Sequence, residues 1–193
     1  MDKSGNKIGI LGGCFDPVHI GHFILAQYAL DQFGLKKILF IPSNIPPHKK
    51  ILYASSHHRY NMLKLAALDN PEFEVSKIEI KKKGVSYSCD TLKELIEKYP
   101  RAEFYLILGA DAFRELETWK NYAQLIKMTN FIVAGRADSG IKKLPRVNMK
   151  KLIMPKISIS ASYLRQRVVR GLSIRYLTPD KVRDYINTYN LYR

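Results

Sequence analysis

Two histidines, His19 and His22, lie three positions apart in the stretch "GILGGCFDPVHIGH" near the N-terminus. The apolar run before them is typical of a buried strand, and the residues after them have the spacing of a helix. Two imidazoles at this spacing in the first turn of a helix share one face, and Gly21 between them leaves that face open. Such a pair can bind phosphate oxygens and stabilise the charge that builds up during group transfer. The stretch therefore predicts a triphosphate-binding junction between a strand and a helix.

Two adjacent glycines, Gly12 and Gly13, precede these histidines at the end of the apolar run. Glycines remove side chains where the backbone must turn and where the oxygens of an anion approach N–H groups. The helix start that follows would add unpaired N–H donors and partial positive charge. Both features suit a bound phosphate.

A second segment, "SISASYLRQRV", combines serines with an arginine at another expected helix start. Ser160 and Ser162 lie where the helix begins, and Arg165 lies one turn into it. Serine hydroxyls cap free N–H groups, and a guanidinium binds phosphate oxygens through two parallel donors, which lysine cannot do. We expect this segment to meet the histidine segment around a single triphosphate.

The elements that must position these residues alternate along the chain. Continuously apolar or period-2 runs predict strands at 7–13, 37–42, 73–80, 103–109, 130–135 and 151–155. Apolar residues at helical spacing predict amphipathic helices at 22–33, 57–69, 89–99 and 121–128. Gly34 is expected to cap the first helix, and Thr178 is expected to cap a last helix with Pro179 in its first turn.

This alternation predicts an α/β fold, a Rossmann-like, open and mainly parallel sheet with helices on both faces. The whole chain, residues 1–193, is expected to form a single domain, with 135–151 as a surface loop. In such sheets ligands bind beyond the carboxyl ends of the strands, where the strand order reverses. The first strand usually lies near that point.

The composition excludes several classes of protein. An apolar fraction of 46% with 25% charged residues is ordinary for a globular protein. The N-terminus lacks a secretory signal and the apolar runs are strand-sized, so we expect a soluble cytoplasmic protein without membrane association. The two cysteines, Cys14 and Cys89, are far apart and form no metal-binding motif. A formal charge of +15 suits either a nucleic acid or a phosphate-rich small substrate.

The motif "GGCFDPVHIGH" resembles the GGTFDPxHxGH signature of the HxGH nucleotidylyltransferases, and Ile159 to Arg165 resembles their ISSTxIR segment. The resemblance implies that the two histidines hold the phosphates of ATP and that no covalent enzyme intermediate forms. Cys14 stands where that family usually has Thr or Ser. The change is harmless if this position acts through its backbone N–H, and it weakens phosphate binding if the hydroxyl matters.

Further segments narrow the resemblance to the bacterial nicotinate-nucleotide adenylyltransferases. "PSNIPPHKK" is similar to their PxxxPPHK loop, "KGVSYSCDTL" to KGxSYTxDTL, "GADAF" to GADxF and "LETWKNY" to LxxWxxY. The C-terminal "GLSIRYLTPDKVRDYINTYNLY" resembles their closing GxSIRYLVPxxVxxYIxxxxLY. The similarity runs from about residue 7 to 192 with the motifs in the same order.

The resemblance implies two sets of binding residues and a catalytic set of His19, His22 and Arg165. The ATP-binding set is Gly12, Gly13, Cys14, Phe15, His19, His22, Gly109, Asp111, Ser160, Ser162 and Arg165. The mononucleotide-binding set is Asp16, Lys49, Tyr87, Ser88, Trp119 and Lys120. Asp16 either orients its loop or approaches the acceptor phosphate, and the sequence leaves both roles open. Trp119 is expected to stack on a pyridine ring, and the backbone N–H of Lys120 with the Ser88 region to receive a nicotinate carboxylate.

The implied substrates are ATP and nicotinate mononucleotide, with Mg²⁺ held mainly by the ATP phosphates because the motifs contain no carboxylate cluster. No nucleic acid is expected as a partner, and the chain could form a homo-oligomer. Two alternatives remain open, an enzyme that prefers nicotinamide mononucleotide and a basic RNA-binding module on the same fold. A phosphopantetheine enzyme is disfavoured because it usually has Thr in place of His19 and lacks the "PPHK" and "SYSCDTL" segments.

Overall fold

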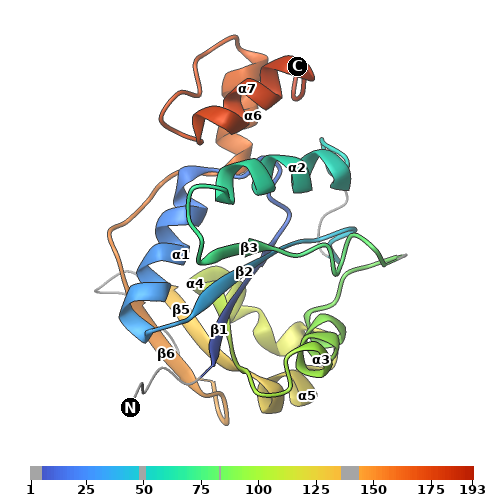
Figure 1. The fold of residues 1–193 in the computed structure, drawn as a ribbon, viewed down its shortest axis with the longest axis vertical. Helices are drawn as coiled ribbons and strands as arrows, with labels where there is room; N and C mark the ends of the chain where they lie inside the picture. The colour runs from blue at the N-terminus through green and yellow to red at the C-terminus, as the bar shows by residue number, and fades with distance from the viewer. Residues whose placement is uncertain (1–5, 48–50, 83, 136–143) are drawn as a thin grey trace.

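The computed structural model describes residues 6–47, 51–82, 84–135 and 144–193 and shows a parallel sheet flanked by helices (Figure 1). The strand order is β3-β2-β1-β4-β5-β6, and all five neighbouring pairs are parallel. The strands are β1 (Lys7–Gly13), β2 (Lys37–Pro42), β3 (Phe73–Val75), β4 (Glu103–Gly109), β5 (Asn130–Gly135) and β6 (Met149–Ile153). The predicted Rossmann-like fold is confirmed.

Helices cover both faces of this sheet. The helices are α1 (Ile20–Phe33), α2 (Ser56–Ala67), α3 (Ser88–Lys98), α4 (Ala110–Arg114), α5 (Tyr122–Met128), α6 (Ala161–Val169) and α7 (Asp180–Thr188), with a 3-10 turn η1 at Leu116–Thr118. In Figure 1, α1 and α2 lie on one side of the strands, and α3 and α5 lie on the other. None of the helices in the described part of the chain is long and apolar enough to cross a membrane.

Successive side chains along a strand point to opposite faces of the sheet, so the strands contribute to two separate hydrophobic cores. Ile38 and Phe40 of β2 pack with α1 and α2, whereas Leu39 and Ile41 of the same strand pack with α3 and α5. All four residues are at most 1% exposed. Burial on both faces explains why the central strands are continuously apolar rather than alternating. A rigid sheet of this kind fixes the positions of the loops that leave its carboxyl edge.

Three predictions about elements are wrong. The predicted loop 135–151 overlaps β6, which begins at Met149, and residues 136–143 of it lie outside the described residues. The stretch 73–80 is a strand only as far as Val75, and turns follow because the chain leaves the sheet after pairing with β2 over three residues. Thr178 does not cap the last helix, because its hydroxyl donates instead to the backbone carbonyl of Val18 at 2.8 Å. The predicted cap at Gly34 is confirmed, since this residue is left-handed (φ 57°) and its N–H bonds the carbonyl of Leu30.

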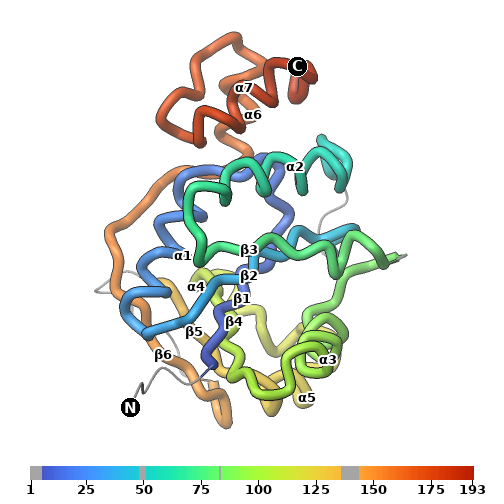
Figure 2. The backbone as a smooth tube through the Cα atoms, in the orientation of Figure 1, coloured from blue at the N-terminus to red at the C-terminus, as the bar shows by residue number. Residues whose placement is uncertain are grey.

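The strand order reverses between β1 and β4, so the loops after these strands diverge to opposite faces of the sheet. After β6 the chain runs up the side of the molecule to α6 and α7, which stack above α2 (Figure 2). α7 packs against α2, and the segment before it bonds the loop after β1. The C-terminal helices therefore lie beside the junction where the sequence predicts a phosphate site.

Candidate active site

The two histidines of the β1–α1 junction stack on each other. Their ring centroids lie 3.7 Å apart at an interplanar angle of 28°. His19 is the extended residue before α1, so the expectation that both imidazoles belong to the first helical turn is wrong. The backbone N–H of His19 donates to Nδ1 of His22 at 3.1 Å, which places the proton of a neutral His22 ring on Nε2. The pair is thus held together by the backbone turn rather than by helical spacing.

His19 is buried and neutral at physiological pH. Its side chain is 8% exposed, and this burial lowers its pKa to about 4. Nδ1 of His19 is also a buried atom without a hydrogen-bond partner among the described residues. A buried polar atom of this kind is costly unless a ligand or water pairs with it. Burial therefore keeps the His19 ring uncharged, so it can act as a hydrogen-bonding group but not as a fixed charge.

Gly21 is required by the position of the His19 ring. A Cβ added at Gly21 would lie 3.1 Å from Nδ1 of His19 and 3.3 Å from the side chain of Ile157. Glycine therefore allows the imidazole and the segment before α6 to approach the helix start closely. The predicted open face is in fact a site of close packing.

Phe15 supports the same pair from within the core. Its side chain is buried, and its ring meets the ring of His22 edge-on with centroids 4.9 Å apart. A Cβ at Gly13 would lie 3.3 Å from this ring, so Gly13 also permits a close approach. Of the predicted contacts with ATP, Phe15 can therefore make only those of its backbone.

The start of α6 meets this junction through Arg165. Nη1 of Arg165 donates to the backbone carbonyl of Asp16 at 2.7 Å, and Nη2 donates to Oγ of Ser162 at 3.2 Å. Ser160 caps the helix by accepting the N–H of Tyr163 at 3.1 Å. Two segments separated by 149 positions thus converge at one place.

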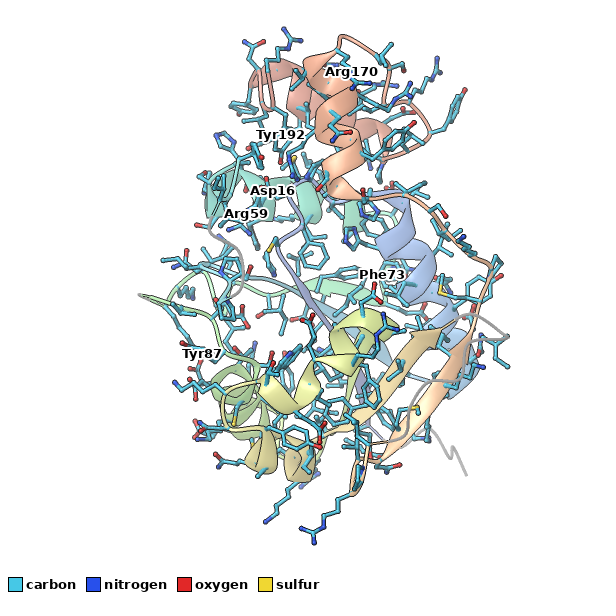
Figure 3. The ribbon with its side chains drawn as sticks, turned by 180° about the vertical axis from the view of Figure 1, so that it is seen from behind. Asp16, Arg59, Phe73, Tyr87, Arg170 and Tyr192 are labelled. Atoms are coloured by element: carbon cyan, nitrogen blue, oxygen red, sulfur yellow. The ribbon has the colours of Figure 1, made fainter. Side chains whose placement is uncertain are left out.

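Asp16 is buried in this loop and accepts several hydrogen bonds through its side chain. Asp16 is 2% exposed, and its carboxylate accepts the N–H of Tyr53 at 2.8 Å, the N–H of Ala54 at 3.1 Å and the hydroxyl of Tyr192 at 2.8 Å. Asp16 and Tyr192 lie next to each other in Figure 3, close to Arg59. Because its oxygens are already bonded and shielded, the structure favours the loop-orienting role over contact with an acceptor phosphate.

Arg59 is a residue that sequence reasoning missed. Its side chain is fully buried in α2, and its guanidinium donates to the backbone carbonyls of Cys14 at 2.7 Å, Asn44 at 3.0 Å and Ala54 at 3.2 Å. These bonds tie the loop after β1 to the loop after β2. The signal was an arginine on the apolar face of an amphipathic segment, three and four positions before Met62 and Leu63.

A cleft of about 490 Å³ opens beside the β1 loop. Predicted residues of both sets line it, namely Gly12, Gly13, Cys14, Tyr87, Ser88, Trp119 and Lys120. Trp119 is half-buried, so it belongs partly to the core and partly to the cleft wall. Nζ of Lys120 lies 4.1 Å from the ring centroid of Tyr87 and 3.4 Å from Oδ2 of Asp90. Tyr87 and Ser88 form the start of α3, whose positive dipole end therefore faces the cleft.

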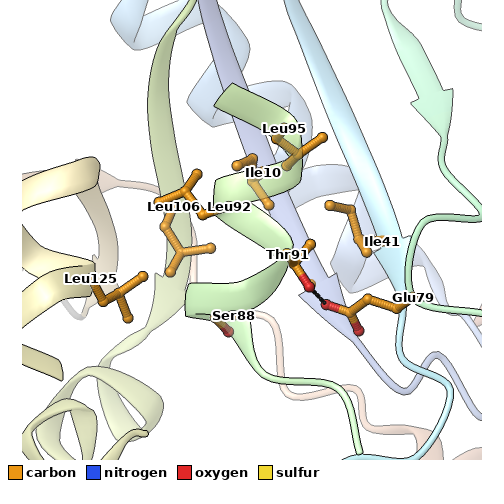
Figure 4. Close-up of a pocket in the computed structure, with 10 residues that line it drawn as sticks. Ile10, Ile41, Glu79, Ser88, Thr91, Leu92, Leu95, Leu106 and Leu125 are labelled. Atoms are coloured by element: carbon orange, nitrogen blue, oxygen red, sulfur yellow. Dashed lines mark hydrogen bonds between the residues drawn. The ribbon is translucent and has the colours of Figure 1, made fainter. Parts of the chain in front are cut away.

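Glu79 also lines the cleft, and the strand pattern of 73–80 gives no signal of this role. It is 8% exposed and accepts the hydroxyl of Thr91 at 2.7 Å. Figure 4 shows this pair at the edge of a smaller apolar cavity under α3. Burial raises the pKa of the Glu79 carboxyl.

Gly109 and Asp111 lie apart from the cleft wall, whereas Cys14 lines it. Gly109 ends β4 and is exposed, and Asp111 follows in the first turn of α4, where its exposed carboxylate pairs with Arg114. Cys14 accepts a weak bond from the hydroxyl of Ser43 at 3.8 Å, and its carbonyl accepts from Arg59. Lys49 lies outside the described residues.

Comparison with protein families identifies relatives along nearly the whole chain. The family model described as cytidylyltransferase-like matches residues 10–167. A probable nicotinate-nucleotide adenylyltransferase of Dictyoglomus turgidum is 42% identical over 193 residues, spanning 96% of this chain and 95% of its own. The protein of the same name from Desulfitobacterium hafniense strain Y51 is 45% identical over 198 residues, spanning 97% and 96%.

Solved structures share the fold. Plasmodium falciparum nicotinic acid mononucleotide adenylyltransferase complexed with NaAD superposes with a TM-score of 0.78 at 24% identity, covering 97% of each chain. The same enzyme complexed with APC superposes with a TM-score of 0.77. These likenesses agree with the Rossmann-like sheet described above.

Proposed function

This chain belongs to the nicotinate-nucleotide adenylyltransferases, within the cytidylyltransferase-like family, and we propose that it transfers the adenylyl group of ATP to nicotinate mononucleotide. The products are nicotinate adenine dinucleotide and pyrophosphate, so the enzyme acts in NAD biosynthesis. In this reaction the 5′-phosphate of the mononucleotide attacks the α-phosphorus of ATP, and the bond to the bridging oxygen of pyrophosphate breaks. Little covalent chemistry falls to the protein, which must align the two phosphates and neutralise charge.

The observation that carries the site assignment is the contact between Arg165 and the loop that ends in the stacked histidines. We assign His19 and His22 to the phosphates of ATP, and Arg165 with the α6 start to the leaving pyrophosphate. The imidazole of His19 is neutral, so it acts as a hydrogen-bonding group rather than as a fixed charge. Arg165 supplies the permanent positive charge.

For the mononucleotide we propose the cleft beside β1. Trp119 offers a ring face for the pyridine, and the backbone N–H of Lys120 with the start of α3 at Ser88 is assigned to the nicotinate carboxylate. We also propose Lys49, which lies outside the described residues, as a cation for the phosphates of either substrate. The charge of +15 suits this reaction, because both substrates and both products are anions.

We propose that Mg²⁺ reaches the site as a complex with ATP. Among the described residues, no three His, Cys, Asp or Glu side chains are grouped so that they could hold a metal ion. We therefore propose that phosphate oxygens and water hold the ion, which neutralises charge on the triphosphate when bound.

Pyrophosphate release tests the proposed function directly. The purified protein is assayed with ATP and Mg²⁺ and, in parallel, with nicotinate or nicotinamide mononucleotide, and the dinucleotide product is identified by mass. We expect a larger kcat/KM with nicotinate mononucleotide. Larger kcat/KM with the amide would reassign the substrate, and no dinucleotide with either would refute the proposal. An RNA-binding module would instead show salt-dependent RNA affinity without turnover.

A further inference from the structure

Tyr53 lies three residues before the start of α2 and places an aromatic ring against Arg165. The guanidinium carbon of Arg165 is 4.1 Å from the centroid of this ring. Tyr53 is 61% exposed, so the burial of apolar surface does not account for its position. A cation over an aromatic face at this distance is an attractive contact, and arginine commonly stacks in this way.

The backbone of Tyr53 is fixed independently of its ring. Its N–H donates to Oδ2 of Asp16 at 2.8 Å, and the next N–H, of Ala54, donates to Oδ1 at 3.1 Å. Ser55 then caps α2 by accepting the N–H of His58. The ring of Tyr53 therefore projects from a segment that is anchored at its own N–H and at the two residues that follow it.

Asp16 also connects this segment to Arg165, in addition to the contact between the Tyr53 ring and the guanidinium. Its side chain holds the backbone of Tyr53, while its main-chain carbonyl accepts Nη1 of Arg165 at 2.7 Å. Ser162 accepts Nη2 of Arg165 at 3.2 Å. Two bonds at the edge of the guanidinium and one ring against its face together fix the plane of the group. Arginine otherwise has many rotamers, so this ordering would have to be supplied during binding.

We propose that Tyr53 is a positioning residue that holds the guanidinium of Arg165 in the plane required to bind a triphosphate. The inference rests on the proposed function, since it assigns Arg165 to the phosphates of ATP. Tyr53 acts through its ring face, and neither its hydroxyl nor a contact of its own with the nucleotide is needed. A guanidinium that is ordered before ATP arrives binds and stabilises the leaving pyrophosphate without first losing rotamer freedom.

A double-mutant cycle tests this coupling. The variants are Tyr53→Phe, which keeps the ring, Tyr53→Leu, which removes it, Arg165→Ala, and Tyr53→Leu combined with Arg165→Ala. For each full-length variant, kcat/KM for ATP, KM for nicotinate mononucleotide, the Kd of a non-hydrolysable ATP analogue by calorimetry, and Tm are measured. Tyr99→Leu is the control for the same exchange away from the site, because the ring of Tyr99 stacks on a different cation, with Nζ of Lys37 4.7 Å from its centroid beside the amino end of β2.

We expect Tyr53→Leu to lower kcat/KM for ATP and to weaken binding of the analogue, each about fivefold, with KM for the mononucleotide and Tm unchanged. Tyr53→Phe should retain at least half of the wild-type value, and Tyr99→Leu should leave the kinetics unchanged. In the Arg165→Ala background, Tyr53→Leu should have no further effect, because its target is already absent.

Three results would overturn the inference. The first is an additional fivefold loss from Tyr53→Leu in the Arg165→Ala background, which would show that Tyr53 acts on its own. The second is an equal loss in Tyr53→Phe, which would assign the effect to the hydroxyl. The third is wild-type kinetics in Tyr53→Leu. If the wild-type protein bound the ATP analogue but made no dinucleotide, the proposed function would fail, while the binding cycle would still decide the role of Tyr53.

Discussion

The hydroxyl of Tyr192 donates to Oδ1 of Asp16 at 2.8 Å, across 176 positions of sequence. This bond ties the last residues of the chain to the loop that leads into the two histidines. Tyr192 is 8% exposed, and this burial, together with the neighbouring Asp16 carboxylate, raises the pKa of its hydroxyl, which therefore stays protonated as a donor. The C-terminus is thus part of the support of the candidate active site.

Tyr192→Phe should destabilise the protein. The variant leaves a buried carboxylate short of one donor, which costs about 1–3 kcal/mol of the free energy of unfolding. Urea denaturation followed by circular dichroism measures this difference, with Tyr176→Phe as the control because Tyr176 is 79% exposed. Equal midpoints for wild type and Tyr192→Phe would show that the bond contributes nothing.

His22→Ala should lower kcat about 100-fold while the fold remains intact, because loss of one preorganised donor typically costs this much. Turnover should not be abolished, since alignment of the substrates is kept. The measurement is steady-state pyrophosphate release together with Tm. His57→Ala serves as the control, because His57 lies on the exposed side of α2 and bonds Asn61. Full turnover by His22→Ala would remove this residue from the site.

The burial of His19 should make stability depend on pH. Its pKa is about 4 in the folded protein and 6.5 in the unfolded chain, so between these values the unfolded state binds more protons. The contribution of His19 to the free energy of unfolding is therefore fully present above pH 6.5. It falls by about 3 kcal/mol as the pH drops towards 4. The free energy of unfolding is measured at both pH values for wild type, His19→Asn and the control His57→Asn. The same pH dependence in wild type and His19→Asn would contradict the assignment.

Trp119→Ala should raise KM for nicotinate mononucleotide more than KM for ATP, because the indole lines the cleft assigned to the mononucleotide. Trp119→Phe, which keeps an aromatic face, should recover most of the loss. Initial rates with one substrate varied at a time separate the two constants. An equal rise in both would indicate that Trp119 acts as a core residue.

Sequence reasoning predicted most of the fold because strand and helix signals were strong and local. The continuous apolar runs of β1, β2, β4 and β5 are consequences of burial on both faces, and they matched the structure closely. It failed at 73–80, where Ile78 and Ile80 alternate with polar residues as in a strand although the chain has already left the sheet. Alternation does not reveal whether a partner strand is present.

The site was predictable only in part. Its candidate binding residues stand in short local motifs, whereas the residues that hold them in place are distant in sequence. His19, His22 and Arg165 stand in short motifs, whereas the partners of Asp16 come from residues 53, 54 and 192. Arg59 stands out as an arginine on the apolar face of its segment, but the backbone carbonyls that it binds leave no pattern in the sequence. The contact between Tyr53 and the distant guanidinium of Arg165 leaves none either. Tertiary contacts of this kind need coordinates.

A crystal structure with a non-hydrolysable ATP analogue is the most direct measurement of whether the two segments serve one triphosphate. We expect the imidazoles of His19 and His22 and the guanidinium of Arg165 to lie within hydrogen-bond distance, about 2.7–3.2 Å, of oxygens of the same triphosphate. A triphosphate bound elsewhere, out of reach of either the histidines or Arg165, would contradict the assignment.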